Sequence, residues 1–193
     1  MNYYESIPNN PKENMPLIIF LHGDGEVANF ARLRNISIVK KIENGELQKD
    51  KYFFIAPNAP QVQWYNSQKN YTTLKELIDY VVSEYKIDKK RIYINGFSGG
   101  ACGTWTMVRN NPNFFAAAVI VSGCSGNIDN SPNTSLYTIY GTRGAETGYQ
   151  GCMDSAYNSF SGTKKHKTLE GLDHIGVQSN YPTDEVIGWM LAQ

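Results

Sequence analysis

One short stretch in the middle of the chain constrains the fold more than any other. An apolar run that favours a β-strand at residues 92–94 ends at Gly96, and a run suited to a helix begins after Gly100. Gly96-Phe97-Ser98-Gly99-Gly100 fits the pattern Gly-x-Ser-x-Gly, in which a serine sits on a strained turn between a strand and a helix. Small residues two positions before and after the serine let the two backbones pass closely. The pattern predicts a nucleophilic Ser98; a glycine-rich turn with an incidental serine is the alternative.

The rest of the chain alternates between apolar runs and amphipathic segments. Continuous apolar runs are typical of strands buried on both faces of a parallel sheet. The clearest helical pattern covers residues 74–85, where apolar residues recur every three or four positions, and Thr73 with Glu76 predicts a capping box at its start. The alternation predicts an α/β fold with a mainly parallel, twisted sheet and helices on both faces. Strands are expected at 17–21, 52–56, 92–94, 116–121, 136–140 and 166–169, and further helices at 36–42, from 101 to a stop at 110–112, at 153–160 and from 182 onward.

Length and charge limit the class of protein. A chain of 193 residues is long enough for one domain, 1–193, with a sizeable core, and we expect its polar residues 1–15 to form a loose lead-in. Lys and Arg number 18 and Asp and Glu number 18, without a basic stripe, which argues against nucleic acid or an anionic membrane as a partner. No apolar run approaches the roughly 18 residues of a membrane span. The first residues also lack the features of a signal peptide, so a cytoplasmic protein is expected unless a leader was removed.

The three cysteines suggest neither a metal site nor a disulfide framework. Cys102, Cys124 and Cys152 match no metal-binding spacing, and their number is odd. Buried or half-buried free thiols are therefore favoured over one disulfide with a cysteine left over.

A serine hydroxyl becomes a useful nucleophile only when a histidine accepts its proton and an acid orients that histidine. In parallel α/β sheets the functional groups gather at the carboxyl ends of the strands. His174 follows the last short strand and comes after Ser98, which fits the chain order serine, acid, histidine. We therefore predict His174 as the general base. His22, in the loop after an early strand, is expected to pin that loop, and His166 stands among lysines at a strand entry.

Ester and amide hydrolysis pass through an oxyanion that needs two backbone N–H donors. One is expected from Gly99, the residue after the nucleophile, and the other from the glycine-rich loop at residues 22–25. We assign the second donor to Asp24, with its neighbour Gly25 as the alternative. Trp64 lies in a polar-aromatic connection and is predicted either to line the substrate site, where it could stack on a sugar, or to belong to the core.

Several segments together resemble the α/β-hydrolase superfamily, and above all its small carboxylesterases of the phospholipase/carboxylesterase, feruloyl-esterase and polyhydroxybutyrate-depolymerase-like groups. The resemblance runs from about Pro16 to His174. It implies a minimal fold without a cap domain and a serine hydrolase that works through an acyl-enzyme without metal or cofactor. The matching segments are Phe20-Leu21-His22-Gly23-Asp24-Gly25-Glu26, Ala56-Pro57-Asn58-Ala59-Pro60 with Trp64, residues 88–100, Gly103-Thr104-Trp105 and residues 112–117.

The chain departs from these enzymes at two positions. Gly99 stands where they often have a larger apolar residue, and Gly144 stands where they usually place the aspartate of the triad. Glu146, two residues later, is the predicted replacement. Asp129 and Asp154 are the alternatives, whereas Asp173 adjoins the base and should point away from it.

Three functions follow from these residues. The first is a serine esterase with a shallow, open site, suited to short acyl groups or to esters that hang from a polymer, because the longest connections, around 61–71 and 123–135, leave little room for a lid. The second is a weak or inactive binding protein, since loss of the acid typically lowers turnover by about 10⁴. The third is a peptidase or amidase on the same scaffold. The oligomeric state and the identity of the acyl and alcohol groups stay open.

Overall fold

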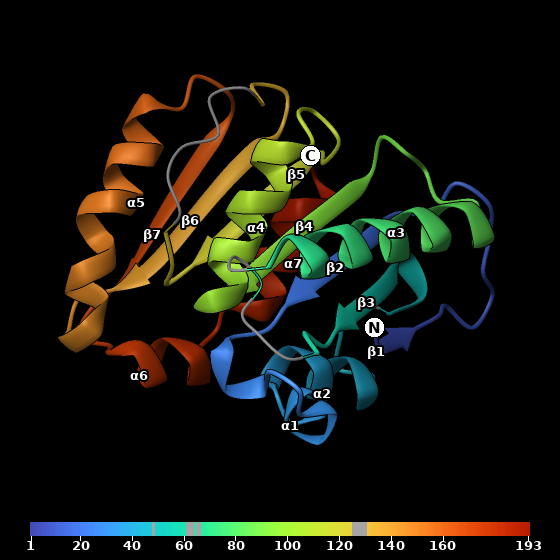
Figure 1. The fold of residues 1–193 in the computed structure, drawn as a ribbon, viewed down its shortest axis with the longest axis horizontal. Helices are drawn as coiled ribbons and strands as arrows, with labels where there is room; N and C mark the ends of the chain where they lie inside the picture. Colours follow the sequence, from blue (N-terminus) through green and yellow to red (C-terminus); the bar gives the residue numbers. More distant parts are fainter. Residues whose placement is uncertain (48, 61–63, 65–66, 125–130) are drawn as a thin grey trace.

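A computed structural model describes the chain except for residues 48, 61–63, 65–66 and 125–130. Within the described part, seven strands form one twisted sheet in the order β1-β3-β2-β4-β5-β6-β7 (Figure 1). Strand β1 is antiparallel to β3, and the other neighbouring strands run parallel, which confirms the predicted α/β fold. The strands are β1 Tyr3–Ser6, β2 Leu17–Leu21, β3 Phe53–Pro57, β4 Ile92–Phe97, β5 Ala117–Val121, β6 Ser135–Gly141 and β7 Lys164–Leu169.

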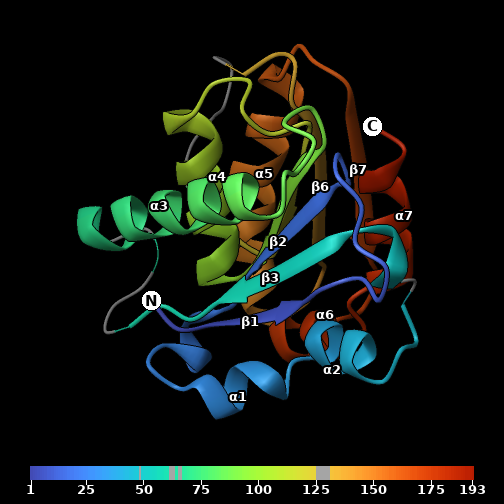
Figure 2. The same ribbon diagram turned by 90° about the vertical axis from the view of Figure 1, so that its right-hand side faces the viewer.

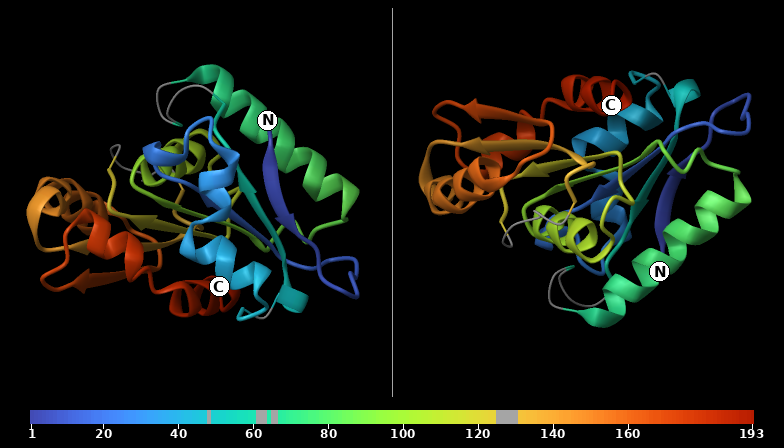
Figure 3. Two further views of the ribbon diagram at one scale, coloured as in Figure 1. Left: turned by 90° about the horizontal axis from the view of Figure 1, so that it is seen from below. Right: turned by 90° about the horizontal axis from the view of Figure 1, so that it is seen from above.

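Helices cover both faces of the sheet. Helices α3, α4 and α5 pack on one face, whereas α1, α2, α6 and α7 contribute to a second core on the other (Figure 2). Seen from below, the twisted sheet lies between the two helix layers (Figure 3, left). No helix among the described residues is both long and apolar enough to span a membrane. The helices are α1 Phe30–Arg34, α2 Ser37–Glu43, α3 Gln68–Glu84, α4 Gly99–Asn110, α5 Thr147–Ser159, α6 His174–Ser179 and α7 Thr183–Leu191.

The central strands explain why the apolar runs are continuous. Every residue of β2, β3, β4 and β5 is buried. Because alternate side chains of a strand point to opposite faces, a strand covered by helices on both faces needs apolar residues at nearly every position. The carboxyl ends of the parallel strands meet along the lower edge of Figure 1, where α6 also lies.

The N-terminal segment is not the loose lead-in that its polar composition predicted. Residues 3–6 form β1, which pairs with β3 from Tyr3 opposite Pro57 to Ser6 opposite Phe54. The strand lies at the edge of the sheet and is only half-buried, so it needs no continuous apolar run, and its sequence carries a weak pattern. The Tyr4 ring packs edge-on against Phe54, with 6.2 Å between ring centroids.

Two helix boundaries and two short helices also differ from expectation. Helix α3 begins at Gln68, with the Ser67 side chain accepting from Asn70 N at 3.1 Å, so the predicted cap at Thr73 lies inside the helix. Helix α5 begins at Thr147, six residues before the predicted start. The short helices α1 and α6 were not expected, because five or six residues are too few to show a helical period.

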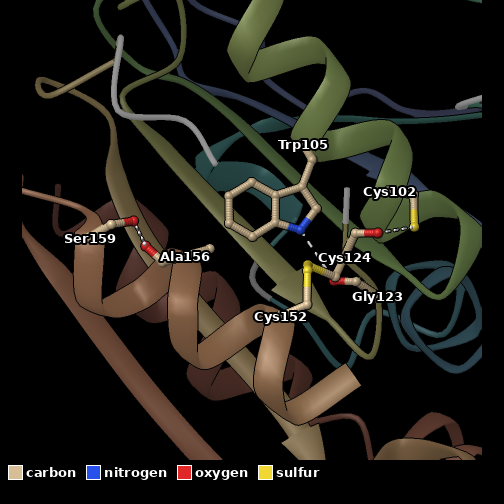
Figure 4. Close-up of a disulfide and its surroundings, with 7 residues drawn as sticks. All are labelled: Cys102, Trp105, Gly123, Cys124, Cys152, Ala156 and Ser159. Carbon is tan, nitrogen blue, oxygen red and sulfur yellow. Dashed lines mark hydrogen bonds between the residues drawn. A yellow bond between two sulfur atoms is a disulfide. The ribbon is translucent and has the colours of Figure 1, made fainter. Parts of the chain in front are cut away.

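A disulfide joins Cys124 to Cys152, so the prediction of three free thiols is wrong (Figure 4). Cys124 follows β5 and Cys152 lies in α5, and neither their separation nor their odd number in the sequence pointed to the pair. Cys102 remains a thiol, half-buried, and donates to the Cys124 carbonyl at 3.3 Å. The cytoplasmic location stays a prediction, although a disulfide is more typical of oxidising compartments.

Loss of this disulfide should destabilise the fold. It closes a loop with a sequence separation of 28, for which chain entropy gives about 3–4 kcal/mol of stabilisation. We expect Cys152→Ser to lower the free energy of unfolding by that amount in guanidinium titrations without reductant. Cys102→Ser is the matched control and should cost less than about 1 kcal/mol, since it opens no loop. Equal losses in the two variants would contradict the assignment.

Candidate active site

The turn after β4 has the strained geometry that its sequence predicted. Ser98 has φ 56° and ψ −121°, which lies outside the regions that a residue with a side chain normally adopts. Its amide donates to Val121 O at 2.9 Å, and this bond anchors the turn to the neighbouring strand. An ideal Cβ on Gly96 would lie 2.2 Å from Gly100 O, and one on Gly100 would lie 2.0 Å from Leu21 O. Both glycines are therefore required by close backbone contacts.

Ser98, His174 and Glu146 form a continuous chain of hydrogen bonds. His174 Nε2 lies 2.9 Å from Ser98 Oγ, and His174 Nδ1 lies 2.6 Å from Glu146 Oε1. The three side chains come from the carboxyl end of β4, the first residue of α6 and the N-terminus of α5. The Phe97 ring stacks on the imidazole with 4.7 Å between centroids and limits its rotation. The arrangement has the geometry of a nucleophile, a base and an orienting acid.

Glu146 is fully buried and has a partner for each carboxylate oxygen. While Oε1 faces His174, Oε2 accepts from Ser122 Oγ at 2.7 Å and from Gly141 N at 2.9 Å. Burial alone would raise the pKa of the Glu146 carboxyl, but the hydrogen bonds from His174, Gly141 and Ser122 outweigh it and lower that pKa. The carboxylate is therefore held in its charged form beside the imidazole.

The glycine at the expected aspartate position has a conformational reason. Gly144 has φ +64°, in the left-handed region where a side chain is strained. It opens the 3₁₀ turn Gly144–Glu146, which leads directly into α5. The turn lets the longer side chain of Glu146 reach His174. Its carboxyl group thus takes the place of the one expected from an aspartate at position 144.

The other candidate acids are engaged elsewhere or lie outside the described residues. Asp154 accepts from Tyr140 Oη at 2.6 Å. Asp173 points away from the base, as predicted: it accepts from Gly176 N at 2.9 Å at the start of α6 and pairs with Arg143 at 3.1 Å. Asp129 lies among residues that the structure does not describe. Within the described part of the chain, Glu146 is the carboxylate that contacts His174.

Gly99 and Asp24, the two residues predicted to supply the oxyanion donors, lie beside each other at the nucleophile. Gly99 is the first residue of α4, so its N–H has no acceptor within the helix. Asp24 begins the 3₁₀ turn Asp24–Glu26, and its carboxyl group lies directly against Gly99. An ideal Cβ on Gly23 would be 3.4 Å from Ser98 Cβ, which places the loop that carries Asp24 next to the serine.

His22 anchors this loop through hydrogen bonds of its ring, which is the role predicted for it. Its Nδ1 lies 2.5 Å from Gly23 O, and its Nε2 accepts from Ala59 N at 3.0 Å. Nε2 is therefore unprotonated, and the ring is neutral with its proton on Nδ1. Burial lowers the pKa of His22 to about 4, with the bond to Gly23 opposing the decrease.

Trp64 belongs to the core and not to the substrate site. It is 3% exposed, and its indole Nε1 donates to His22 O at 3.1 Å. The absence of a side chain at Gly103 leaves room for it, since an ideal Cβ there would lie 2.6 Å from Trp64 Cβ. Of the two roles predicted for Trp64, the structure supports the core role, in which it holds the oxyanion loop.

Two site residues were missed from the sequence. Ser122 follows β5 directly, so the rule that functional groups follow strand ends would have selected it. Tyr149 lies three residues after Glu146 in α5, on the same helix face, and its ring lies 5.7 Å from that of His174. No group of three or more His, Cys, Asp or Glu side chains within the described residues is placed to hold a metal ion.

The fold and the Ser98–His174–Glu146 geometry define a serine hydrolase of the α/β-hydrolase class. A family model described as the prolyl oligopeptidase family matches residues 56–173, which is more than half of the chain. The chain therefore belongs to the prolyl oligopeptidase family.

The curated relatives and solved structures that this chain resembles include esterases. Acetylxylan esterase A of Aspergillus ficuum is 34% identical over 61 residues, which are 32% of this chain and 20% of that protein. Poly(3-hydroxyalkanoate) depolymerase C of Paucimonas lemoignei is 22% identical over 136 residues, which are 64% of this chain and 31% of that protein. The chain thus spans less than a third of either relative. A thermostable esterase has a similar structure, with a TM-score of 0.82, 24% identity, and coverage of 99% of this chain and 58% of that one.

The buried, neutral His22 should make stability depend on pH. Unfolding exposes a histidine with a pKa near 6.5, whereas the folded pKa is about 4, so the unfolded state binds the proton more tightly. The contribution of His22 to the free energy of unfolding is about 3 kcal/mol. It is complete above about pH 6.5 and is lost as the pH falls through about 4.

The difference in unfolding free energy between wild type and His22→Gln, measured by urea titration from pH 4 to 8, isolates this contribution. We expect that difference to shrink on acidification. A difference that stays constant over the range would show that His22 is not the group responsible. The matched control is His166→Gln, at a less buried histidine on β7, which should retain most of the wild-type slope.

Proposed function

We propose that this protein hydrolyses carboxylic esters through an acyl-enzyme on Ser98. The observation that carries the proposal is the hydrogen-bonded chain from Ser98 Oγ through His174 to the buried Glu146 carboxylate. A serine on a strained turn, a base on one side of it and two backbone donors on the other are what acyl transfer needs. The esterases among the relatives and similar structures support the same activity.

Each residue has a distinct step in the proposed reaction. His174 Nε2 accepts the proton from Ser98 Oγ as the oxygen attacks the ester carbonyl. The N–H groups of Gly99 and Asp24 stabilise the oxyanion, and the Glu146 carboxylate stabilises the imidazolium that forms. His174 then gives its proton to the leaving alcohol, and a water activated by the same histidine releases the acid and restores Ser98.

Small acyl groups on a larger alcohol are the substrates we favour. Ser98 and His174 are partly exposed, and the neighbouring Ile175 on α6 is 66% exposed, so the reacting atoms lie close to the surface. A bulky polymer can therefore remain outside while its pendant ester reaches Ser98. The names of the relatives, an acetylxylan esterase and a polyhydroxyalkanoate depolymerase, fit substrates of this kind.

Amide hydrolysis is a second candidate, because the prolyl oligopeptidase family is named for peptidases and the same triad cleaves amides. We rank it below ester hydrolysis, since the curated relatives are ester hydrolases. The glycine at position 144 suggests an inactive binding protein, because it removes the expected acid. We favour that function less, since Glu146 provides a carboxylate at His174.

Covalent labelling tests the proposed nucleophile. A fluorophosphonate should label the wild type at neutral pH, and Ser98→Ala should abolish the label without loss of folding, because the hydroxyl is the group that reacts. A series of nitrophenyl esters of increasing chain length, measured beside an aminoacyl anilide, ranks esterase against amidase activity. Absence of both labelling and turnover in the wild type would refute the proposal.

Removal of the acid should slow ester hydrolysis strongly. Glu146→Gln retains the size of the side chain but cannot hold His174 in the same tautomer or stabilise its charge, so kcat should fall by at least about a hundredfold. Asp154→Asn, in the helix that follows Glu146, is the matched control, because the Asp154 carboxylate bonds to Tyr140 instead. A rate for Glu146→Gln equal to that of the control would exclude Glu146 from the triad.

A further inference from the structure

The carboxyl group of Asp24 fills the space that a side chain on the residue after the nucleophile would occupy. An ideal Cβ on Gly99 would lie 1.9 Å from Asp24 Oδ1, 2.7 Å from its Cγ and 3.3 Å from its Oδ2, and these are the three nearest atoms. Asp24 is itself exposed. A solvent-accessible carboxylate therefore forms part of the wall beside Ser98.

This carboxylate lies close to the reacting atoms. An ideal Cβ is about 2.5 Å from its own backbone nitrogen, so Asp24 Oδ1 lies within about 4.4 Å of Gly99 N. An oxyanion bound to that N–H would sit about 3 Å from the nitrogen. The repulsion between this carboxylate and the oxyanion is common to all esters, but a further unit charge on the substrate about 6 Å from Asp24 would change the rate between about threefold and a hundredfold, depending on how far water screens the two charges.

The neighbours of Asp24 on α4 and α5 are uncharged. Burial raises the pKa of the Cys102 thiol and of the Tyr149 phenol, and the negative charge of Asp24 adds to both increases. Of the nearby acids, Glu146 is buried against His174. Glu26 is also near, since its Oε2 and Ser98 Cβ both lie 3.4 Å from an ideal Cβ on Gly23; burial raises the pKa of its carboxyl, the Asp24 charge adds to that increase, and Arg32 opposes it. The Asp24 carboxylate is thus the negative group that a substrate meets beside Gly99.

We propose that Asp24 determines the charge selectivity of the site. Its carboxylate disfavours esters with an anionic group beside the scissile carbonyl and favours esters that offer a cation or hydrogen-bond donors such as hydroxyls there. The inference rests on the ester hydrolysis proposed above. The backbone N–H of Asp24 and its side chain have separate tasks, so a substitution of the side chain leaves the oxyanion donor in place.

Three nitrophenyl esters of similar size separate charge from shape: 4-(trimethylammonio)butanoate, 5,5-dimethylhexanoate and hemiglutarate. For the wild type, kcat/KM should follow the order cationic, neutral, anionic, and added salt should compress the differences. Asp24→Asn keeps the shape of the side chain and removes its charge. We expect this variant to lower the cationic-to-anionic ratio by at least about tenfold. Asp79→Asn, on the exposed face of α3, changes the net charge equally and should leave the ratio within twofold.

The outcomes distinguish this inference from the proposed function. A wild type that cleaves none of the esters refutes both. A wild type that cleaves them with a ratio unchanged by Asp24→Asn overturns the role of Asp24 alone.

A steric test checks the placement of the carboxyl group without relying on activity. Gly99→Ala should lower the melting temperature in the wild type, because its Cβ meets Asp24, and should be tolerated in the Asp24→Gly background. An equal loss in both backgrounds would contradict the contact and with it the inference.

Discussion

The buried carboxylate of Glu146 is the group on which the arrangement of the site depends. A buried charge is costly unless hydrogen bonds compensate for it, and Glu146 obtains them from three separate segments. Ser122 follows β5, Gly141 ends β6 and His174 begins α6. The carboxylate therefore ties together adjacent carboxyl ends of the sheet and the start of α6, a short helix that also buries Val177 in the core. The Cys124–Cys152 disulfide adds a covalent link between the segment after β5 and α5, which carries the acid.

A few residues of the loop after β2 both anchor the loop to the core and shape the surroundings of the nucleophile. His22 anchors the loop to the segment after β3, and Trp64 holds the His22 carbonyl from the core. Asp24 then lies beside the nucleophile turn, with its carboxyl group in the space that a side chain on Gly99 would occupy. The contact explains why Gly99 has no side chain: the space beside the nucleophile is filled from a neighbouring loop. Because His22 is buried and neutral in the folded state, its protonation at low pH should lower the free energy of unfolding of the whole protein.

The parts of the fold that follow from burial were predictable from the sequence. Strands covered on both faces need continuous apolar runs, and a nucleophile on a strained turn needs Gly96 and Gly100, so both leave clear patterns. The assignment of Glu146 over Asp154 depended on a turn at Gly144 whose direction no pattern encodes. Edge strand β1, the six-residue α6 and the disulfide depend on contacts between distant segments, which a single sequence does not reveal.

The central claim is that Glu146 holds His174 in position to activate Ser98 opposite the Gly99 and Asp24 amides. A crystal structure of the protein after reaction with a phosphonate ester tests it most directly. Phosphorus should be bonded to Ser98 Oγ, with one phosphonyl oxygen within about 3.1 Å of both amide nitrogens and His174 Nδ1 still on Glu146. A different carboxylate at His174 Nδ1, or a phosphonyl oxygen turned away from Gly99 and Asp24, would contradict the account.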